Sequence, residues 1–430
     1  MEKNLAFKEL LAIAVGGMVG GGIFTILGIA VAMVGVLAPF AIAFGGVIAF
    51  FAAYSYVKLG VYYKDEGATY AFFKRTYPQS HLAASFIGWY TIFGYISTLA
   101  LYAYTFASYS LSSFDIGHSV WLQKSLAVGI IWLFTAINLW SVKGMGKLED
   151  IMVYSKLLIL LVISLALGYY GETDFSTFFE TMHVDFQHTT MLSLMIVSSV
   201  TFVAYEGFQL VINAVNEMEM PEKNIPKAIY SAIFLVALFY FIIAMGAVLA
   251  IPTQELIANK EDALAAGAYN IMGVWGKNFV ILGAVLATSS AISGTMFGSS
   301  RQMARIAEDG YLPHKLSKRK NHIPTYAIVA MSLTATCLVL IGGLELILEF
   351  GSITFLLVSL LMSIANFHIR DKTNASSLFT LISMFGLFVG TVLILYYEFQ
   401  TKPEQLLFIV LLYFLLSLGA WSYAKIQKAS

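Results

Sequence analysis

Seven residues near the amino terminus read Gly16-Gly17-Met18-Val19-Gly20-Gly21-Gly22, inside an apolar stretch that extends from residue 8 to residue 34. A glycine in a helix interior costs about 1 kcal/mol relative to alanine, so five glycines in so short a run predict that the helix is interrupted here. In lipid, non-helical backbone survives only where it lines a cavity or is covered by protein. The alternative is a glycine face for close helix packing, although such a motif needs fewer glycines.

A second weak point for a helix lies in the apolar stretch 189–218, where residues 202–208 read Phe-Val-Ala-Tyr-Glu-Gly-Phe. The two weak points lie in the first and the sixth expected spans, so the corresponding helices would run in opposite directions. Paired interrupted helices in matching positions indicate a secondary transporter built from an inverted repeat. A continuous helix with aromatic packing residues is the alternative at this second position.

The composition agrees with a membrane location. Of 430 residues, 59% are hydrophobic and 12% are charged, with 25 basic and 25 acidic residues, and the mean hydropathy is +0.79. Soluble domains carry about 25% charged residues, so an ordinary soluble enzyme is excluded. A nucleic-acid-binding protein needs a basic excess, and a disordered chain needs low hydrophobicity. We therefore expect an all-α, multi-pass membrane protein.

Apolar segments separated by proline, glycine and charge clusters predict twelve spans of the length that a bilayer requires. We expect one membrane domain over residues 1–430, with a first repeat over 1–170, a second repeat over 189–368 and two further helices within 376–425. The apolar segment 11–34 is too long for a cleavable signal and should be retained. The expected spans are 8–34, 37–61, 83–112, 121–142, 149–170, 189–218, 227–250, 267–306, 323–344, 347–368, 376–398 and 405–425.

The distribution of basic residues predicts the orientation, because cytoplasmic loops are rich in lysine and arginine. With both termini cytoplasmic, 20 of the 25 basic residues lie in or beside cytoplasmic segments. One, Lys156, lies inside a span, and the external loop 171–188 contains acidic residues and no lysine or arginine. We expect a protein of the plasma (cytoplasmic) membrane. The four basic residues outside are Lys124, Lys260, Lys277 and Lys402.

The two interruptions suggest a site for an amino acid. A helix that restarts near Ile23 presents free N–H groups and a positive dipole end, which suit a carboxylate. The helix that ends before the second interruption presents free carbonyl groups, which suit an ammonium, and Phe202 could close over the substrate as an aromatic gate. The predicted substrate-binding residues are Gly20, Gly21, Gly22, Phe202, Val203, Ala204 and Glu206.

Four sequence blocks together resemble the amino acid–polyamine–organocation (APC) superfamily. They are GGMVGGGIF at 16–24, FVAYEGF at 202–208, a glutamate and proline followed by NIPKAI within 217–229, and RQMARIAEDGYLP at 301–313. In order and spacing they cover roughly residues 8 to 330. The resemblance implies the LeuT-type fold, with ten helices in an inverted five-plus-five repeat that includes broken helices 1 and 6, and substrates that are amino acids or related amines.

Lys156 is the clearest single candidate for function. A lysine within the membrane costs about 2.5–3.5 kcal/mol on insertion scales and is usually functional, although its side chain can also snorkel to the headgroups. Residues 144–160 resemble helix 5 of the proton-coupled ApcT-like branch. That resemblance implies that the lysine amine replaces a sodium ion and links helix 1 to helix 8.

The same resemblance implies the partners of Lys156. They are backbone carbonyls near Gly16 and Gly17 and a hydroxyl on helix 8. Ala287 occupies the position where that branch can carry a serine, so the hydroxyl is expected from Ser290, one turn further on. The hydroxyl-rich segment 288–293 is equally compatible with plain hydrogen bonding between helices.

An intramembrane carboxylate such as Glu206 also indicates a functional site. It could contact a cationic substrate, carry a second proton, or cap N–H groups after the break. On helix 3, Tyr95, Tyr102 and Tyr109 follow one another at spacings of seven. That stripe favours packing, with the first two as weaker candidates for the pocket.

We therefore expect a symporter that imports amino acids with protons by alternating access. The alternative is an exchanger or importer of cationic amino acids or polyamines that uses Glu206. A channel, sensor or intramembrane enzyme is less favoured, since the sequence contains no phosphate-binding loop and no hydrolase motif. We expect no metal site and no cofactor beyond the coupling proton. The expected partners are a small-molecule substrate and the lipid bilayer.

Overall fold

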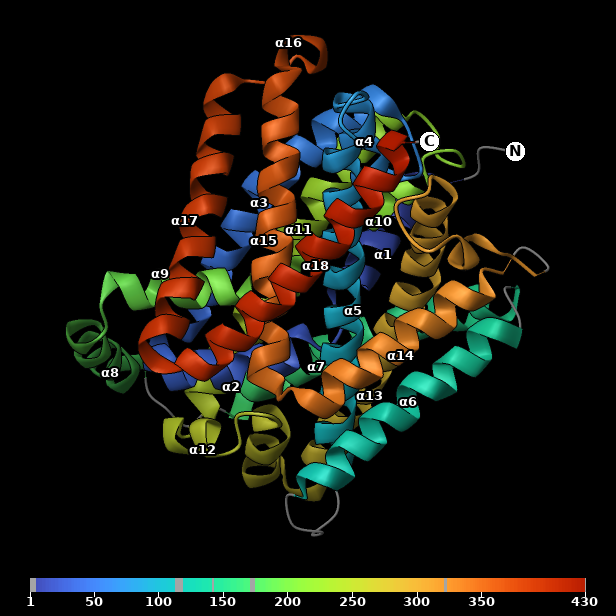
Figure 1. Ribbon diagram of the computed structural model, residues 1–430. Helices are drawn as coiled ribbons and strands as arrows, with labels where there is room; N and C mark the ends of the chain where they lie inside the picture. The colour runs from blue at the N-terminus through green and yellow to red at the C-terminus, as the bar shows by residue number, and fades with distance from the viewer. Residues whose placement is uncertain (1–4, 113–118, 141–142, 171–174, 321–322, 430) are drawn as a thin grey trace.

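The computed structural model describes residues 5–112, 119–140, 143–170, 175–320 and 323–429, which form helices and connecting loops without a β-strand among them (Figure 1). The first half contains α1 (Phe7–Met18), α2 (Gly22–Val34), η1 (Gly35–Leu37), α3 (Ala38–Tyr63), α4 (Ala68–Thr76), α5 (His81–Leu111), α6 (Val120–Trp140), α7 (Lys143–Tyr170) and α8 (Phe175–His188). The second contains α9 (Met191–Val200), η2 (Thr201–Tyr205), α10 (Leu210–Asn213), α11 (Pro221–Ala250), α12 (Thr253–Ala258), α13 (Ala263–Glu308), η3 (His314–Ser317), α14 (Thr325–Ile341), α15 (Leu344–His368), α16 (Arg370–Thr373), α17 (Ser377–Thr401) and α18 (Pro403–Ala429).

The arrangement is that of a multi-pass membrane protein, as expected. Within the described residues, ten helical segments are long and apolar enough to cross a bilayer, and one of them, Gly22–Tyr63, joins α2 to α3. The apolar helix α14 is shorter, at 17 residues. The count of twelve spans and the five-plus-five repeat stay predictions. Figure 1 places both chain ends at the same end of the molecule, with α8 and α12 toward the other.

Both predicted helix interruptions are present. The helix α1 ends at Met18 and α2 begins at Gly22, which leaves a short non-helical link. The second interruption follows α9, where a 3₁₀ turn gives way to extended backbone at Glu206 and to a φ of 124° at Gly207. Glycine tolerates this φ because it has no Cβ atom. The second helix interruption therefore lies where the sequence predicted it.

The two interruptions pack against each other. A methyl group on Gly207 would lie 2.5 Å from the carbonyl carbon of Gly17, and one on Gly22 would lie 2.8 Å from the Cβ atom of Ala204. The glycines thus serve both alternatives raised by the sequence, since they break the helix and allow close packing. Tyr240 of α11 reinforces the contact, because its hydroxyl lies 2.9 Å from the Met18 carbonyl oxygen and 3.2 Å from that of Ala204.

Two expected boundaries differ from the structure. The span expected over 267–306 belongs to α13, which bends at Gly273 with a φ of 64°. This bend divides a helix that is too long for a single crossing. The segment expected as an external loop, 171–188, contains the helix α8, while residues 171–174 lie outside the described residues. Asp185 holds α8 in place by accepting a hydrogen bond of 2.9 Å from the Val36 amide.

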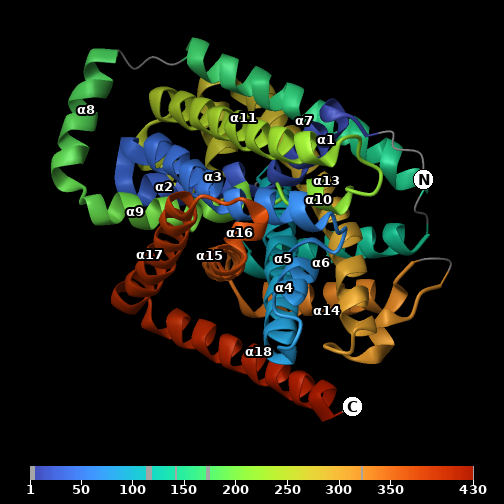
Figure 2. The same cartoon turned by 90° about the horizontal axis from the view of Figure 1, so that it is seen from above.

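Helix α5 runs through the middle of the assembly, and α17 and α18 lie along one edge (Figure 2). At the end near the chain termini, Leu5 pairs with the backbone after α10. Its amide donates to the Glu217 carbonyl at 3.0 Å, and its carbonyl accepts from the Glu219 amide at 3.0 Å. The segment before the first broken helix is therefore joined to the segment that follows the second.

We predict that Gly207→Ala lowers the melting temperature of the detergent-purified protein by several degrees. The new methyl group would meet the Gly17 backbone, and the left-handed backbone would carry a strain of about 1–3 kcal/mol. Gly129→Ala is the matched control, because no atom lies within 4 Å of a methyl group there. Equal melting temperatures for the two variants would contradict the close contact between the broken helices.

Candidate functional site

Lys156 lies on α7 with none of its surface exposed. Its ammonium Nζ donates to the Gly16 carbonyl oxygen at 2.7 Å and to the Ser290 hydroxyl at 3.2 Å. The lysine therefore joins α7 to the end of α1 and to the middle of α13. These two contacts were expected from the resemblance, and the side chain does not snorkel to the surface.

The break in α1 makes this carbonyl available. In a continuous helix the Gly16 carbonyl would accept from the amide of Gly20. Here the Gly20 amide turns to the Met18 carbonyl instead, at 2.9 Å. The lysine ammonium takes up the freed acceptor, and Ser290 supplies a hydroxyl that the alanine at 287 lacks.

The start of α2 has the features of an anion site. Among the described residues, the backbone N–H groups of Gly21, Gly22, Ile23 and Phe24 meet no hydrogen-bond acceptor, and the first amide of this helix that does is that of Thr25, which donates to Gly21. These free donors lie at the positive end of the helix dipole. The residues expected to hold a carboxylate therefore present free N–H groups at this helix end, and their role in binding stays a prediction.

The carbonyl groups at the second interruption are partly occupied. The Val203 carbonyl accepts from the Glu206 amide at 3.2 Å, and the Ala204 carbonyl lies 3.2 Å from the Tyr240 hydroxyl. Phe202 is fully buried. The Tyr240 hydroxyl lies near the carbonyl oxygens of both Ala204 and Met18 but has only one proton, so it can donate to one of them at a time. Sequence reasoning missed this tyrosine, and its only signal is a hydroxyl in an otherwise apolar part of α11.

Glu206 belongs to a small buried network with Gln209. The Gln209 amide nitrogen donates to Glu206 Oε2 at 2.7 Å and to the Tyr95 hydroxyl at 3.2 Å, while its oxygen accepts from the Gly207 amide at 3.1 Å. The N–H group after the break is thus capped by Gln209, a residue that sequence reasoning missed. The other oxygen of Glu206, Oε1, is buried and has no hydrogen-bond partner in the described part of the chain.

The tyrosine stripe of α5 faces the two interruptions. Tyr95 contacts Gln209, and Tyr109 donates to the Phe24 carbonyl at 2.8 Å. The ring of Tyr102 covers Gly20 so closely that a methyl group there would lie 2.8 Å from it. The stripe packs the core, as favoured, and all three rings also border the candidate site.

A cavity of about 1120 Å³ leads into the molecule from the end where the termini lie. Its lining includes Gly16, Gly17, Ser290 and Ala291 and a rim of charged residues from α4 and α13. The cavity therefore reaches the partners of Lys156. It does not reach the residues expected to bind substrate, which are packed together beyond its inner end: Gly20, Gly21, Gly22, Phe202, Val203, Ala204 and Glu206.

The rim of this cavity is held by an acidic residue just after α13. Asp309 accepts from the Tyr70 hydroxyl at 2.8 Å and pairs with Lys74 at 2.8 Å. Burial and the neighbouring Asp309 carboxylate raise the pKa of Tyr70 above its usual range, so the hydroxyl stays protonated and donates. These contacts join α4 to α13 at the cavity mouth.

The chain resembles known membrane transport proteins over most of its length. The pattern of the amino acid permease family matches residues 5–423. The chain is 28% identical to an uncharacterized protein of Methanocaldococcus jannaschii, over 93% of this chain and 91% of that protein. It is 28% identical to the inner membrane transport protein YbaT of Escherichia coli, over 87% and 86% of the two chains.

A further relative is the branched-chain amino acid permease BcaP of Bacillus subtilis, which is 23% identical over 84% of this chain and 80% of that protein. The family pattern covers nearly the whole sequence, including both helix interruptions and Lys156. The match agrees with the superfamily resemblance of the four sequence blocks. The chain therefore belongs to the amino acid permease family, whose members are multi-pass membrane transporters rather than enzymes.

Proposed function

We propose that this protein imports amino acids by proton symport through alternating access, across the cytoplasmic membrane and with both termini on the cytoplasmic side. The observation that carries the proposal is the contact of the fully buried Lys156 ammonium with Gly16 and Ser290. A buried lysine amine changes its protonation state readily when its surroundings change. Its two partners belong to the broken helix α1 and to α13, so the charge of this one group acts on the contact between three helices.

The proton would act through the strength of this contact. A charged ammonium donates hydrogen bonds about twice as strong as those of a neutral donor, so protonated Lys156 holds the end of α1 against α7 and α13. Because the cavity reaches Gly16 and Ser290, water there can accept the proton of the ammonium on the cytoplasmic side. The neutral amine then holds α1 less firmly, and the broken helix is free to move.

The substrate would lie between the two interruptions. Its carboxylate would accept from the free amides of Gly21, Gly22 and Ile23, and its ammonium would contact the carbonyls of Phe202 and Val203. These groups are packed together, while the cavity next to them is open at the end of the molecule where the termini lie. Alternating access requires such a separation between an open vestibule and a closed site.

A second candidate function is transport of a cationic amino acid or polyamine. The observation that favours it is Glu206 Oε1, a buried carboxylate oxygen without a hydrogen-bond partner among the described residues. A substrate ammonium would supply the missing donor. The Tyr95 hydroxyl, which Gln209 links to this carboxylate, would border the same space.

We predict that Lys156→Gln abolishes the dependence of uptake on an inward proton gradient in liposomes. Glutamine can still donate to Gly16 but cannot exchange a proton, so exchange of labelled for unlabelled amino acid should persist. Lys223→Gln, on the exposed surface of α11, is the matched control and should respond to the gradient like the wild type. Gradient-driven accumulation by Lys156→Gln would refute the coupling role.

We predict that Glu206→Gln separates the two candidate substrates. Uptake of a labelled amino acid is measured in competition with neutral and basic amino acids and with polyamines. If Glu206 holds a cation, the basic compounds compete with the wild type, and their competition weakens by roughly tenfold or more when this charge-assisted contact is lost. If only neutral amino acids compete, and equally well in the variant, transport of a cationic amino acid or polyamine is excluded.

A further inference from the structure

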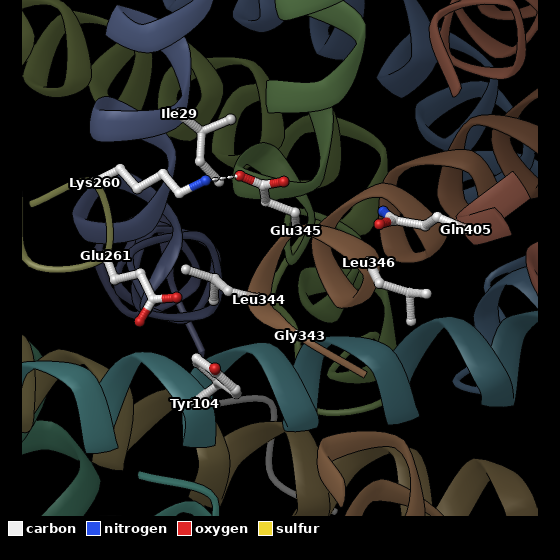
Figure 3. A pocket seen from close by; sticks show the side chains of 9 residues that line it. All are labelled: Ile29, Tyr104, Lys260, Glu261, Gly343, Leu344, Glu345, Leu346 and Gln405. Atoms are coloured by element: carbon white, nitrogen blue, oxygen red, sulfur yellow. Dashed lines mark hydrogen bonds and ion pairs between the residues drawn. The ribbon is translucent and has the colours of Figure 1, made fainter. Parts of the chain in front are cut away.

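A second group of charges, two of them buried, lies away from the candidate site, where α15 begins and α17 meets α18 (Figure 1). Helix α15 begins there with Glu345 and Glu349, one turn apart. Lys402, between α17 and α18, donates to Glu345 at 2.7 Å and to Glu349 at 3.1 Å. Lys260, from the loop before α13, pairs with Glu345 across a pocket of about 210 Å³ (Figure 3).

Glu398 is the one carboxylate of this group without a donor. It lies in the last turn of α17, has no exposed surface, and neither of its oxygens has a hydrogen-bond partner among the residues that the structure describes. Glu349 is its neighbour on α15, because Lys402 donates its backbone amide to the Glu398 carbonyl oxygen at 2.8 Å and its ammonium to Glu349 Oε1 at 3.1 Å, which brings the two carboxyl groups together. Glu349 itself is well supplied, since Oε1 accepts from Lys402 and Oε2 accepts from the amide of Gln405.

Two ionised carboxylates cannot remain in contact inside a protein, because each charge destabilises the other and both lose their hydration. The sum of the charges in the group also indicates that one carboxyl is protonated. Three carboxylates (Glu345, Glu349 and Glu398) face two ammonium groups, so one added proton makes the group neutral. That proton also supplies the hydrogen-bond donor that the oxygens of Glu398 lack.

We propose that Glu398 and Glu349 form a proton-binding site, in which the protonated carboxyl of Glu398 donates its O–H to the carboxylate of Glu349. The proton thereby joins α17 to α15. Through Glu345 and Lys260 the same network reaches α2, where a methyl group on Gly28 would lie 2.3 Å from the Lys260 carbonyl oxygen. The site is separate from Lys156 and does not depend on the proposed function.

A proton fits this site better than a metal cation does. Lys402 and Gln405 already occupy the oxygens of Glu349, so few oxygens remain to surround an ion. The charged and titratable groups nearest the pair are Glu345 on α15, Tyr397 on α17 and Lys402 at the α17–α18 junction. Lys260, Glu261 and Tyr104 line the pocket beyond Glu345, where Glu261 accepts from the side-chain amide of Gln123 at 2.7 Å. Without the added proton, the three carboxylates and two ammonium groups carry a net charge of −1.

The test compares the full-length wild type with Glu398→Gln, whose neutral amide can still donate to Glu349. The infrared spectrum of the purified wild type minus that of Glu398→Gln at neutral pH should contain a protonated-carboxyl C=O band, because subtraction removes the contribution of any carboxyl common to both proteins, such as Glu206. Between neutral pH and about pH 10, deprotonation should lower the melting temperature of the wild type by roughly 2–4 °C more than that of Glu398→Gln. Glu404→Gln, an exposed neighbour on α18, should follow the wild type in both measurements.

A difference spectrum without such a band would overturn the proposal. So would a sodium-dependent rise in the wild-type melting temperature that disappears in this variant, because that result would assign a metal cation to the pair. If Glu398→Gln does not fold, Glu349→Gln removes the same carboxyl pair, and loss of the infrared band is then read in that variant. Transport activity enters neither measurement, so the result is independent of the role of Lys156.

Discussion

A helix that breaks inside a membrane must have its freed backbone groups covered, because lipid offers them no hydrogen bonds. In this protein the two broken segments cover each other. Gly17 lies against Gly207, Gly22 lies against Ala204, and the Tyr240 hydroxyl sits between the two free helix ends. The close approach requires glycine on both sides at Gly17 and Gly207 and on one side at Gly22, so the interruption and the packing have one cause.

The packing of the two broken segments leaves a few of their backbone N–H and C=O groups without a partner in the other segment. These groups form the candidate functional site. The Gly16 carbonyl, released by the end of α1, receives the Lys156 ammonium. The first amides of α2 receive nothing from the described residues and remain available to an anion. A lysine that would otherwise be costly in the membrane is thereby stabilised by an acceptor that would otherwise be unsatisfied. The two unfavourable features compensate each other.

Much of this could be predicted from the sequence, because the responsible signals are local. Clustered glycines weaken a helix wherever they occur, so both breaks were predicted correctly, and a lysine among apolar residues needs a partner. The contact of Lys156 with Gly16 was expected from the superfamily resemblance, which left Ser290 as the candidate for the hydroxyl. Tyr240 was missed because its partners, Met18 and Ala204, are distant in the sequence. Gln209 was missed because its side chain can reach Glu206 and Gly207 only after the helix has broken. Either Glu206 or Gln209 could have capped the Gly207 amide. The structure assigns the cap to Gln209, whose side-chain nitrogen is oriented by the Tyr95 hydroxyl.

The same reasoning explains why the acidic pair at α15 and α17 escaped attention in the sequence. Glu349 and Glu398 are 49 positions apart, and each lies near the end of an apolar segment, where a glutamate normally reaches water. Only the fold buries Glu398 and brings it to a carboxylate that already has its donors. A charge near a helix end is therefore informative when its surroundings leave it without a partner. By that criterion Glu206 and Glu398 are alike, since each is buried and each retains carboxylate oxygen that the described residues do not satisfy.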